Sequence, residues 1–408
     1  MYITISPGIH SQCLSHIDRE IDSELVHQET VDPPQSVNPL GLPAYLGTEI
    51  MSLPTTKHQL VIDLPCYINY DLFNIPEVDF QYLSAKGCFT LPPKCAIDEF
   101  LKCYFDFVPP QLPILDEQEF LDSYQIVQEG EPSKSTTNQR KISLLLFQAV
   151  LFAASSYVSL STLQKAGYTT RSGARRSLFH KVRALYSLDV EKDQIAVLQS
   201  LLLMSFWRGT PDDHKDAWHW SGLAISLAST IGLQSKPKAM LKERHQILHK
   251  RCWWSCVLRD RLLALSEHRR PRIRLEECDV PMLTLADFNV FLRSGLCELS
   301  AEEELGKRIA LTMSVIQLIR LVICTNDIEQ PTAEDAVTTP KTPMDTWART
   351  VSYRNEDFVS TQCAALDSWW FNLPEVLQHT PGAGTEKATF PCVLLQRNAL
   401  HMIYQYDL

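Results

Sequence analysis

A pair of tryptophan-bearing helical patterns between residues 216 and 283 constrains the fold of this chain more than any other feature. Within residues 220–231, apolar side chains recur at intervals of three and four, which places them on one face of a helix. Gly232 follows, where a helix end favours a residue that tolerates positive φ. The same spacing recurs within residues 254–265. We therefore expect a helical hairpin, joined by a basic linker, that holds much of the core.

The rest of the chain divides into parts around this hairpin. Residues 1–95 are rich in proline and poor in helical periodicity, which predicts a partly ordered leader. Residues 96–325 carry the apolar helical patterns and are predicted to form the main domain. Residues 326–350 are rich in Thr, Pro and acidic side chains, as in an exposed loop. Helices within 351–408 are expected to pack on the main domain.

The main domain is predicted to be built from helices alone. Two prolines end the first helix after residue 108, and Asp116 is the expected N-cap of the next, with Glu119 three residues on as in a capping box. The chain has no alternation of strands and helices and no repeat of fixed period. The predicted fold class is all-α, a bundle or solenoid-like arrangement, with further helices at 142–160, 172–187, 193–207 and 299–324.

Composition excludes several classes of protein. The net charge of −10 and a pI near 5.7 do not indicate a chain that binds nucleic acid by itself. The 12 cysteines include no C-x-x-C pair, which argues for reduced thiols in an intracellular protein rather than a disulfide framework. No apolar run reaches the roughly 18 residues of a membrane span, and residues 1–10 lack the pattern of a secretory signal, so no membrane partner is expected.

Five segments in order resemble one known family, the fungal-specific transcription factor domain, and most closely its cutinase transcription factor subfamily. They read G-C-F-T-L-P-P-K, Y-F-D-F-V-P-P-Q-L-P-I-L-D-E-Q-E-F, D-A-W-H-W-S-G-L-A-I-S-L-A-S-T-I-G-L, R-C-W-W-S-C-V-L-R-D-R-L-L-A-L and R-R-P-R-I-R-L-E-E-C-D-V-P-M-L. The resemblance is clear over residues 80–290. It implies a helical regulatory domain of a nuclear transcription regulator, with dimerisation, restraint of activity or sensing of a small-molecule effector as its roles.

Members of this family usually carry a binuclear zinc cluster whose six cysteines hold two zinc ions and dock a helix in the DNA major groove. Before residue 80 this chain offers only Cys13 and Cys66, and two thiols cannot hold two zinc ions. Contact with DNA is therefore expected only if a missing exon or a partner supplies the cluster. Protein partners, including a second copy of the chain, are expected instead.

The strongest rival is a magnesium-dependent terpenoid enzyme. Asp212, Asp213 and Asp216 spell D-D-x-x-D, which gathers Mg²⁺ against a diphosphate in all-α terpene cyclases. A second metal motif is only partly present at Asn326, Asp327 and Glu334, because Gln330 stands where Ser or Thr is needed and Pro331 interrupts the helix. The first motif also lies just before a helix, where acidic side chains favour the positive end of the dipole.

One helix face could bind a metal ion. His245, His249, Cys252 and Cys256 recur at intervals of four, three and four. Four ligands spread over three turns cannot close on one zinc ion without help, so buried thiols and exposed imidazoles are the favoured interpretation.

Two further patterns in the hairpin admit both a functional and a structural role. The tryptophan pairs Trp218/Trp220 and Trp253/Trp254 could line an effector pocket, although such stripes usually belong to the core. Residues 269–274, R-R-P-R-I-R, could serve nuclear import or bind an acidic partner. Arg259 and Arg261 are expected to bridge to carboxylates, namely those of Asp260, Glu267, Glu276 or Glu277.

The resemblance implies a regulator of RNA polymerase II genes in a fungal nucleus, with a biosynthetic gene cluster as one class of target. No nucleophile elbow, P-loop or dinucleotide fingerprint is present, and no enzyme activity is expected. No catalytic, cofactor-binding or metal-binding residue and no cofactor is assigned. The alternatives are the terpenoid enzyme and a regulatory scaffold that does not bind DNA.

Overall fold

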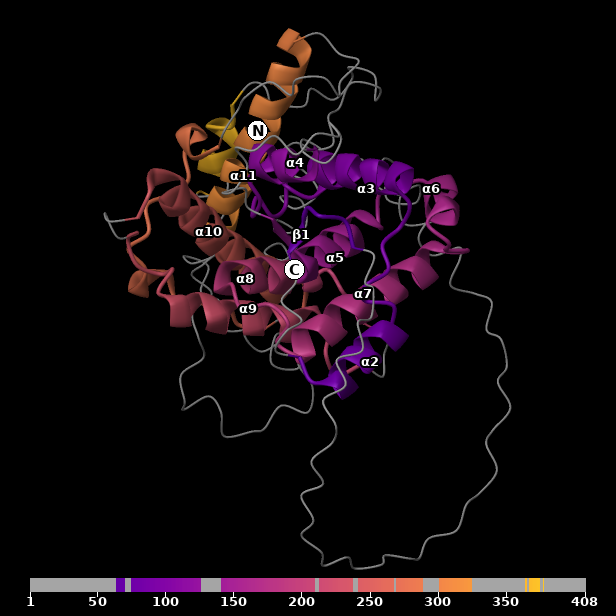
Figure 1. Cartoon of the computed structure of the whole chain (residues 1–408). Helices are drawn as coiled ribbons and strands as arrows, with labels where there is room; N and C mark the ends of the chain where they lie inside the picture. Colours follow the sequence, from indigo (N-terminus) through magenta and orange to yellow (C-terminus); the bar gives the residue numbers. More distant parts are fainter. Residues whose placement is uncertain are drawn as a thin grey trace, which may run out of the picture. The chain divides into compact units, whose positions relative to one another are not determined.

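A computed structural model of the chain describes helices that all fall within residues 61–408 (Figure 1). The described residues are 64–69, 75–125, 141–209, 213–237, 241–267, 269–288, 301–324, 364, 367–374 and 377. Within these ranges most residues are helical and very few lie in strands, which confirms the predicted all-α class. No described helix is long and apolar enough to cross a lipid bilayer.

The elements follow the chain in an order dominated by helices. They are β1 Ile68–Asn69, α2 Glu77–Ala85, α3 Lys94–Phe107, α4 Glu117–Gln125, β2 Ile142–Ser143, α5 Leu144–Ala154, α6 Leu160–Lys165, α7 Arg171–Ser187, α8 Gln194–Met204, α9 Ala217–Ile231, α10 Glu243–Ser266, η2 Leu275–Glu277, η3 Leu285–Asp287 and α11 Ala301–Cys324.

Helix α5 forms the centre of the core, and every one of its residues is buried. It packs against α3, α7 and α8, so it has no face toward solvent on which a polar stripe would be needed (Figure 1). Helix α8 is nearly as apolar, and it packs in turn on α9. Asp193 caps the start of α8 by accepting a hydrogen bond from Ile195 N–H at 3.1 Å.

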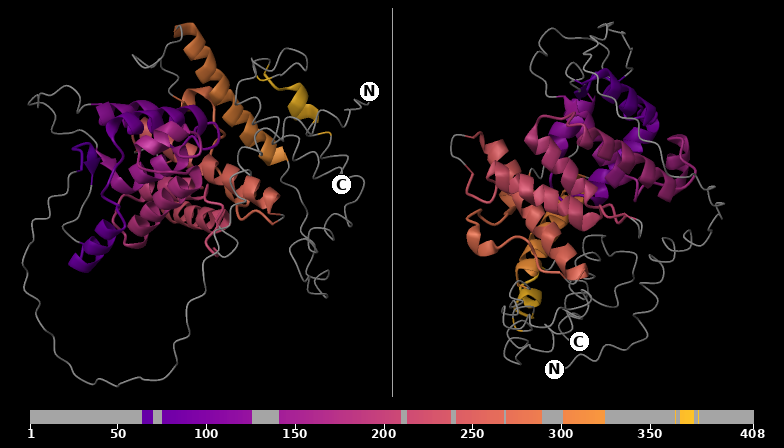
Figure 2. Two further views of the ribbon diagram at one scale, coloured as in Figure 1. Left: turned by 90° about the vertical axis from the view of Figure 1, so that its right-hand side faces the viewer. Right: turned by 90° about the horizontal axis from the view of Figure 1, so that it is seen from below.

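The predicted hairpin is present as α9 and α10, which contact each other along the core (Figure 2). Asp216 caps α9, since its carboxylate accepts a hydrogen bond from His219 N–H at 2.9 Å. Gly232 ends the helix in the left-handed conformation, with φ of 85°. Trp220 and Trp253 are among the largest fully buried side chains of the described structure. The glycine end predicted for this helix is therefore confirmed.

The segment after α5 differs from the sequence prediction. One helix was expected over residues 142–160, but α5 ends at Ala154 and a separate helix, α6, begins at Leu160. The guanidinium of Arg171 donates hydrogen bonds from Nη1 to the carbonyl oxygens of Ser155, Ser156 and Val158, at 2.8–3.1 Å. The Arg171 side chain thus supplies hydrogen bonds to carbonyl groups that would have been bonded within the helix if α5 continued. These bonds stabilise the end of α5 at Ala154.

Two features lie within residues 64–95, which the sequence assigns to the leader. Helix α2 is one of them, and a short parallel pairing is the other, with Ile68 opposite Ile142. The predicted helix over 353–372 overlaps a helical stretch at 367–371, where the indole N–H of Trp369 donates to the carbonyl of Gln317 at 3.1 Å. The predicted last helix, over 392–406, lies outside the described residues.

Candidate functional site

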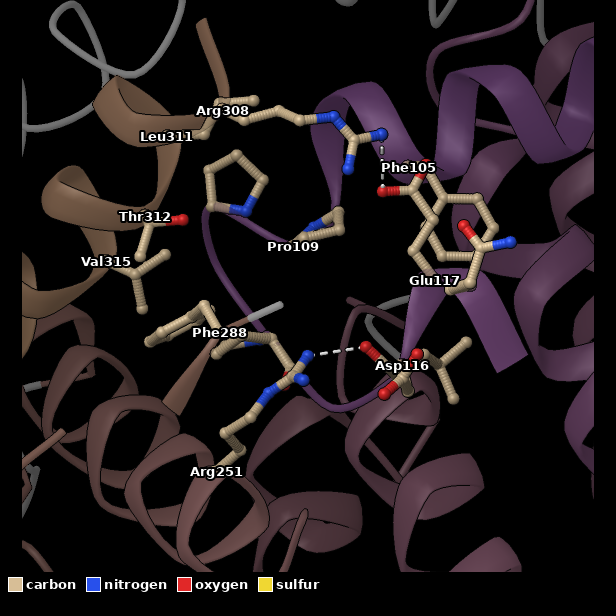
Figure 3. Close-up of a pocket in the computed structure, with 14 residues that line it drawn as sticks. Phe105, Pro109, Asp116, Glu117, Arg251, Phe288, Arg308, Leu311, Thr312 and Val315 are labelled. Carbon is tan, nitrogen blue, oxygen red and sulfur yellow. Dashed lines mark hydrogen bonds and ion pairs between the residues drawn. The ribbon is translucent and has the colours of Figure 1, made fainter. Parts of the chain in front are cut away.

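A pocket lies where the linker between α3 and α4 meets α10, the residue after η3, and α11 (Figure 3). Its volume is about 100 Å³. The linker forms one wall with Pro109, Pro110 and Pro113, whose fixed backbone angles make it stiff. Leu311 and Val315 of α11 form the facing wall. The pocket is therefore bounded by segments that are distant in sequence.

The guanidinium of Arg251, from α10, forms the polar floor of this pocket. Its Nε donates to the carbonyl of Pro113 at 2.7 Å, and its Nη2 donates to the carbonyl of Leu115. One face of the group lies over the ring of Phe288, 5.2 Å from the centroid. The side chain is only 7% exposed, and burial lowers the pKa of Arg251 from its ordinary value.

Ion pairs surround the pocket at its rim. Arg308 of α11 meets Glu117 at 3.1 Å, a contact that links α11 to the start of α4 (Figure 3). Arg244 meets both Asp116 and Glu119 at 3.3 Å, and Asp116 also caps α4 through Glu119 N–H. The N-cap role predicted for Asp116 is confirmed. Because the arginine heads reach across from α10 and α11, these pairs tie both helices to the linker.

The acidic D-D-x-x-D motif does not form a metal site in the described structure. Asp213 accepts a hydrogen bond from the indole N–H of Trp207 at 3.0 Å, and Asp216 is the N-cap of α9. Asp212 lies outside the described residues, as do Asn326, Asp327 and Glu334. Within the ranges given above, no three His, Cys, Asp or Glu side chains gather in the manner of a metal site. The carboxylates of Asp213 and Asp216 thus have structural partners.

On the His/Cys face of α10 the thiols are buried, as the structural interpretation predicted, but the imidazoles are half-buried rather than exposed. Cys252 and Cys256 are fully buried, and burial raises the pKa of Cys252 to about 12, so the thiol stays protonated. His245 and His249 are half-buried, and burial lowers the pKa of His249. Among the described residues, these four side chains are not part of a group that could hold a metal ion.

The basic segment 269–274 is fixed in place by the hairpin. Both the Arg272 and Ile273 N–H groups donate to the carboxylate of Asp260, at 2.7 and 2.8 Å. The guanidinium of Arg272 stacks on Trp218 at 3.6 Å from the ring centroid. A Cβ built at Gly222 would lie 3.1 Å from that guanidinium carbon, so glycine leaves room for the stack. The backbone at Arg272 and Ile273 is therefore anchored to α10 through Asp260.

Two half-buried arginines lie beyond the pocket, Arg175 and Arg259, and their hydrogen-bond partners were not predicted from the sequence. Arg259 was expected to bridge to a carboxylate, but its Nε donates to the hydroxyl of Ser205 at 2.8 Å and its Nη2 to the Ser205 carbonyl. Arg175 donates to the carbonyl of Phe206 at 3.1 Å. Both therefore bind the end of α8, where the helix dipole is negative. The role of Arg251 was missed in the same way, although an arginine amid buried aromatic residues is a visible signal.

Arg261 and the tryptophans complete the account of the predicted sites. Arg261 donates to the carbonyl of Ile273 at 2.9 Å. Trp220 and Trp254 donate to the carbonyls of Lys215 and Pro281, each at 2.9 Å. None of the four hairpin tryptophans lines the pocket described above. Trp220, Trp253 and Trp254 are buried in the core, whereas Trp218 is half-buried and lies under the guanidinium of Arg272.

Comparison with known proteins gives a family match and several similar regulators. A model described as "Fungal specific transcription factor domain" matches residues 101–331. "Cutinase transcription factor 1 beta" of Fusarium vanettenii is 34% identical over 84% of this chain and 39% of its own length. "Transcription factor cpaR" of Aspergillus oryzae is 31% identical over 84% of this chain and 56% of its own.

A third relative is similar over a shorter part. "Fusaric acid cluster transcription factor FUB12" of Fusarium oxysporum f. sp. lycopersici is 30% identical over 52% of this chain and 30% of its own length. The chain thus spans less than two thirds of each of these relatives. No solved structure matches it.

Proposed function

Because the chain belongs to the fungal-specific transcription factor domain family, we propose that it regulates RNA polymerase II transcription in a fungal nucleus. The observation that carries this proposal is the family match itself, which covers residues 101–331 and thus the hairpin, α11 and the pocket. The family is one of transcription factors rather than enzymes. The name of one relative refers to a cluster, which supports a biosynthetic gene cluster as the target.

The helical domain would act in this role through its surfaces and its stability rather than through bond-making chemistry. The rival terpenoid enzyme loses support because Asp213 and Asp216 are engaged as partners of Trp207 and of the α9 backbone. A regulatory domain needs a core that holds a defined surface, which the all-buried α5 and the hairpin supply. We place this domain at residues 96–325, with the C-terminal residues 351–408 packing on it.

Partners follow from the same proposal. These 408 residues contain no C-x-x-C pair, so contact with DNA would depend on a zinc cluster supplied by an additional exon or by another protein. A protein partner or a second copy of the chain would bring the domain to a promoter. A small-molecule effector would then set its activity.

A tethering experiment tests this function. The chain is fused to a heterologous DNA-binding domain in a fungal cell, and a reporter with the matching sites is measured. We expect the reporter to change relative to the DNA-binding domain alone, and the fused protein to enter the nucleus. A matched variant, Phe147→Asp, puts a charge into the core beside α5 and should abolish the change. An unchanged reporter, together with unchanged transcripts after gene disruption, would refute the proposal.

A further inference from the structure

We propose that the pocket between the α3–α4 linker and α11 binds a small organic acid, with its carboxylate on Arg251 and its apolar body against the proline and α11 walls. This ligand would be the effector of the regulator proposed above, and the inference rests on that function only for its biological meaning. Binding itself is a property of the purified chain and can be tested without any promoter.

The first step of the argument is the hydrogen-bonding capacity of Arg251. A guanidinium has five N–H donors, and here Nε and Nη2 are used on the carbonyls of Pro113 and Leu115. Among the described residues, Nη1 has no hydrogen-bond partner, and no carboxylate lies within ion-pair distance of the group. An arginine that is only 7% exposed and lines a cavity therefore keeps donors for a ligand.

The second step concerns the charges around Arg251. Asp116 and Asp287 offset part of its charge from beyond ion-pair distance. Both already have closer cations, because Asp287 meets Lys250 at 2.6 Å and Asp116 meets Arg244 at 3.3 Å. Of the two described arginines that line the pocket, Arg308 is paired with Glu117, whereas the hydrogen bonds of Arg251 go to neutral carbonyls. A ligand carboxylate would form a charge-assisted pair there, stronger than a neutral hydrogen bond.

The third step concerns size and polarity. A volume of about 100 Å³ is several times the space that one water molecule needs, roughly 10–15 Å³, and suits a single ring or a short chain. Phe105, Leu311 and Val315 supply apolar contacts. Thr312 turns its hydroxyl toward the same space (Figure 3). A bulky or highly charged ligand would fit neither the volume nor these walls.

A consequence for regulation follows from where the walls come from. The ligand would contact α11 on one side and the α3–α4 linker on the other, which are otherwise joined at the rim by the Arg308–Glu117 ion pair. Binding would therefore stabilise the docked position of α11 by mass action. A surface that depends on this position would respond to the concentration of the acid.

The experiment uses para-fluorobenzoate as the probe, with para-fluorobenzamide as its neutral match, observed by fluorine NMR on the full chain. We expect saturable binding of the acid and binding of the amide that is weaker by about tenfold, which corresponds to about 1.4 kcal/mol. Inorganic phosphate, which lacks an apolar body, should not displace the acid. Equal binding of acid and amide, or no saturable binding of the acid, would overturn the proposal.

Variants locate the site. Arg251→Lys should weaken binding of the acid. Because this variant also loses hydrogen bonds to the linker, two further variants are needed to locate the site. Leu311→Trp fills the pocket from α11 and should abolish binding, whereas Arg320→Trp, on an exposed position of the same helix, should leave it unchanged. Thr312→Val, which is close to isosteric, should weaken binding only slightly. Binding that survives Leu311→Trp in a folded protein would place the ligand elsewhere and refute the site.

Discussion

Helix α10 carries Arg251, which is buried, and Arg259, which is half-buried, and the two side chains make similar contacts in different surroundings. Each donates through Nε and Nη2, and each lies over a phenylalanine ring, Phe288 at 5.2 Å and Phe206 at 4.9 Å. Arg251 binds carbonyls of an irregular linker beside a cavity. Arg259 binds Ser205, at the end of a helix.

The surroundings of the two arginines explain why their roles differ. Arg259 lies near other cations, and its pKa is lowered to about 10 by burial and then by the charge of Arg208. The pKa of Arg175 is likewise lowered to about 10, by burial and by the charge of Arg208. The partial negative charge at the end of α8 is what holds this cationic group together. Around Arg251, by contrast, no neighbouring cation lowers the pKa, Asp116 and Asp287 offset the charge, and the cavity leaves donors free. The first site is a helix cap and the second is a binding floor.

Replacing each arginine by leucine would test this difference, and we expect the largest effect at Arg259. Arg259→Leu leaves the Ser205 carbonyl and hydroxyl buried without their donor, which should lower the free energy of unfolding by about 3 kcal/mol. Arg251→Leu should cost less, about 2 kcal/mol, because water can enter through the adjoining pocket and reach the carbonyls of Pro113 and Leu115 once the guanidinium is removed. Urea denaturation measures both. Equal losses would mean that the two sites are not different in kind.

Asp260 offers the next largest effect, beside Arg259 on the same helix. Its carboxylate is fully buried and accepts from two backbone N–H groups of the 269–274 segment. Asp260→Ala should cost about 2 kcal/mol, because these donors lose their partner. Asp260→Asn keeps one acceptor oxygen and should cost less. An alanine variant as stable as the parent would show that the segment is held by other contacts.

The same carboxylate gives a pH dependence with a defined sign. Burial raises the pKa of Asp260 above its ordinary 3.8, although the two backbone N–H bonds act in the opposite direction. A folded-state pKa that is raised contributes stability below the unfolded value, and this contribution is lost as the pH rises through the folded value. The stability of the parent relative to Asp260→Asn should therefore fall with rising pH in the acidic range and stay flat above it. Denaturation curves across that range measure this difference.

These contrasts also mark how far the sequence could predict the structure. The glycine end of α9 and the N-cap Asp116 were predicted because each signal acts over a few residues. Asp216 was predicted to lie just before a helix, but its role as the N-cap of α9 was not predicted. Arg251 and Arg259 were not assigned correctly because their partners lie 138 and 54 positions away. Sequence spacing carries no information about such pairings. It indicated that charge interrupts the apolar stripe of α10, but not which carbonyl groups that charge would meet.

The cap at the start of α9 should have a smaller effect than the arginine cap at the end of α8. Asp216→Ala removes the acceptor for His219 N–H and should cost about 1 kcal/mol, whereas Asp216→Ser should restore most of it. The motif interpretation predicts something else, namely that Mg²⁺ stabilises the parent and not the variant. Thermal denaturation with and without Mg²⁺ separates the two, and a magnesium-dependent shift lost in Asp216→Ala would favour the metal.

The smallest expected effect has the opposite sign. Arg208 is exposed, but its charge lowers the pKa of both Arg175 and Arg259 and so disfavours their charged forms in the folded state. Arg208→Leu should relieve this repulsion and stabilise the fold by a few tenths of a kcal/mol, the scale of exposed charge interactions. The gain should shrink at high salt, because screening already weakens the repulsion there. Arg270→Leu, which removes an exposed arginine outside this cluster, is the matched control. If Arg208→Leu destabilised the protein at low salt, the cations around α8 would have to be holding a bound anion, and Arg259 would then resemble Arg251 more closely than its contacts suggest.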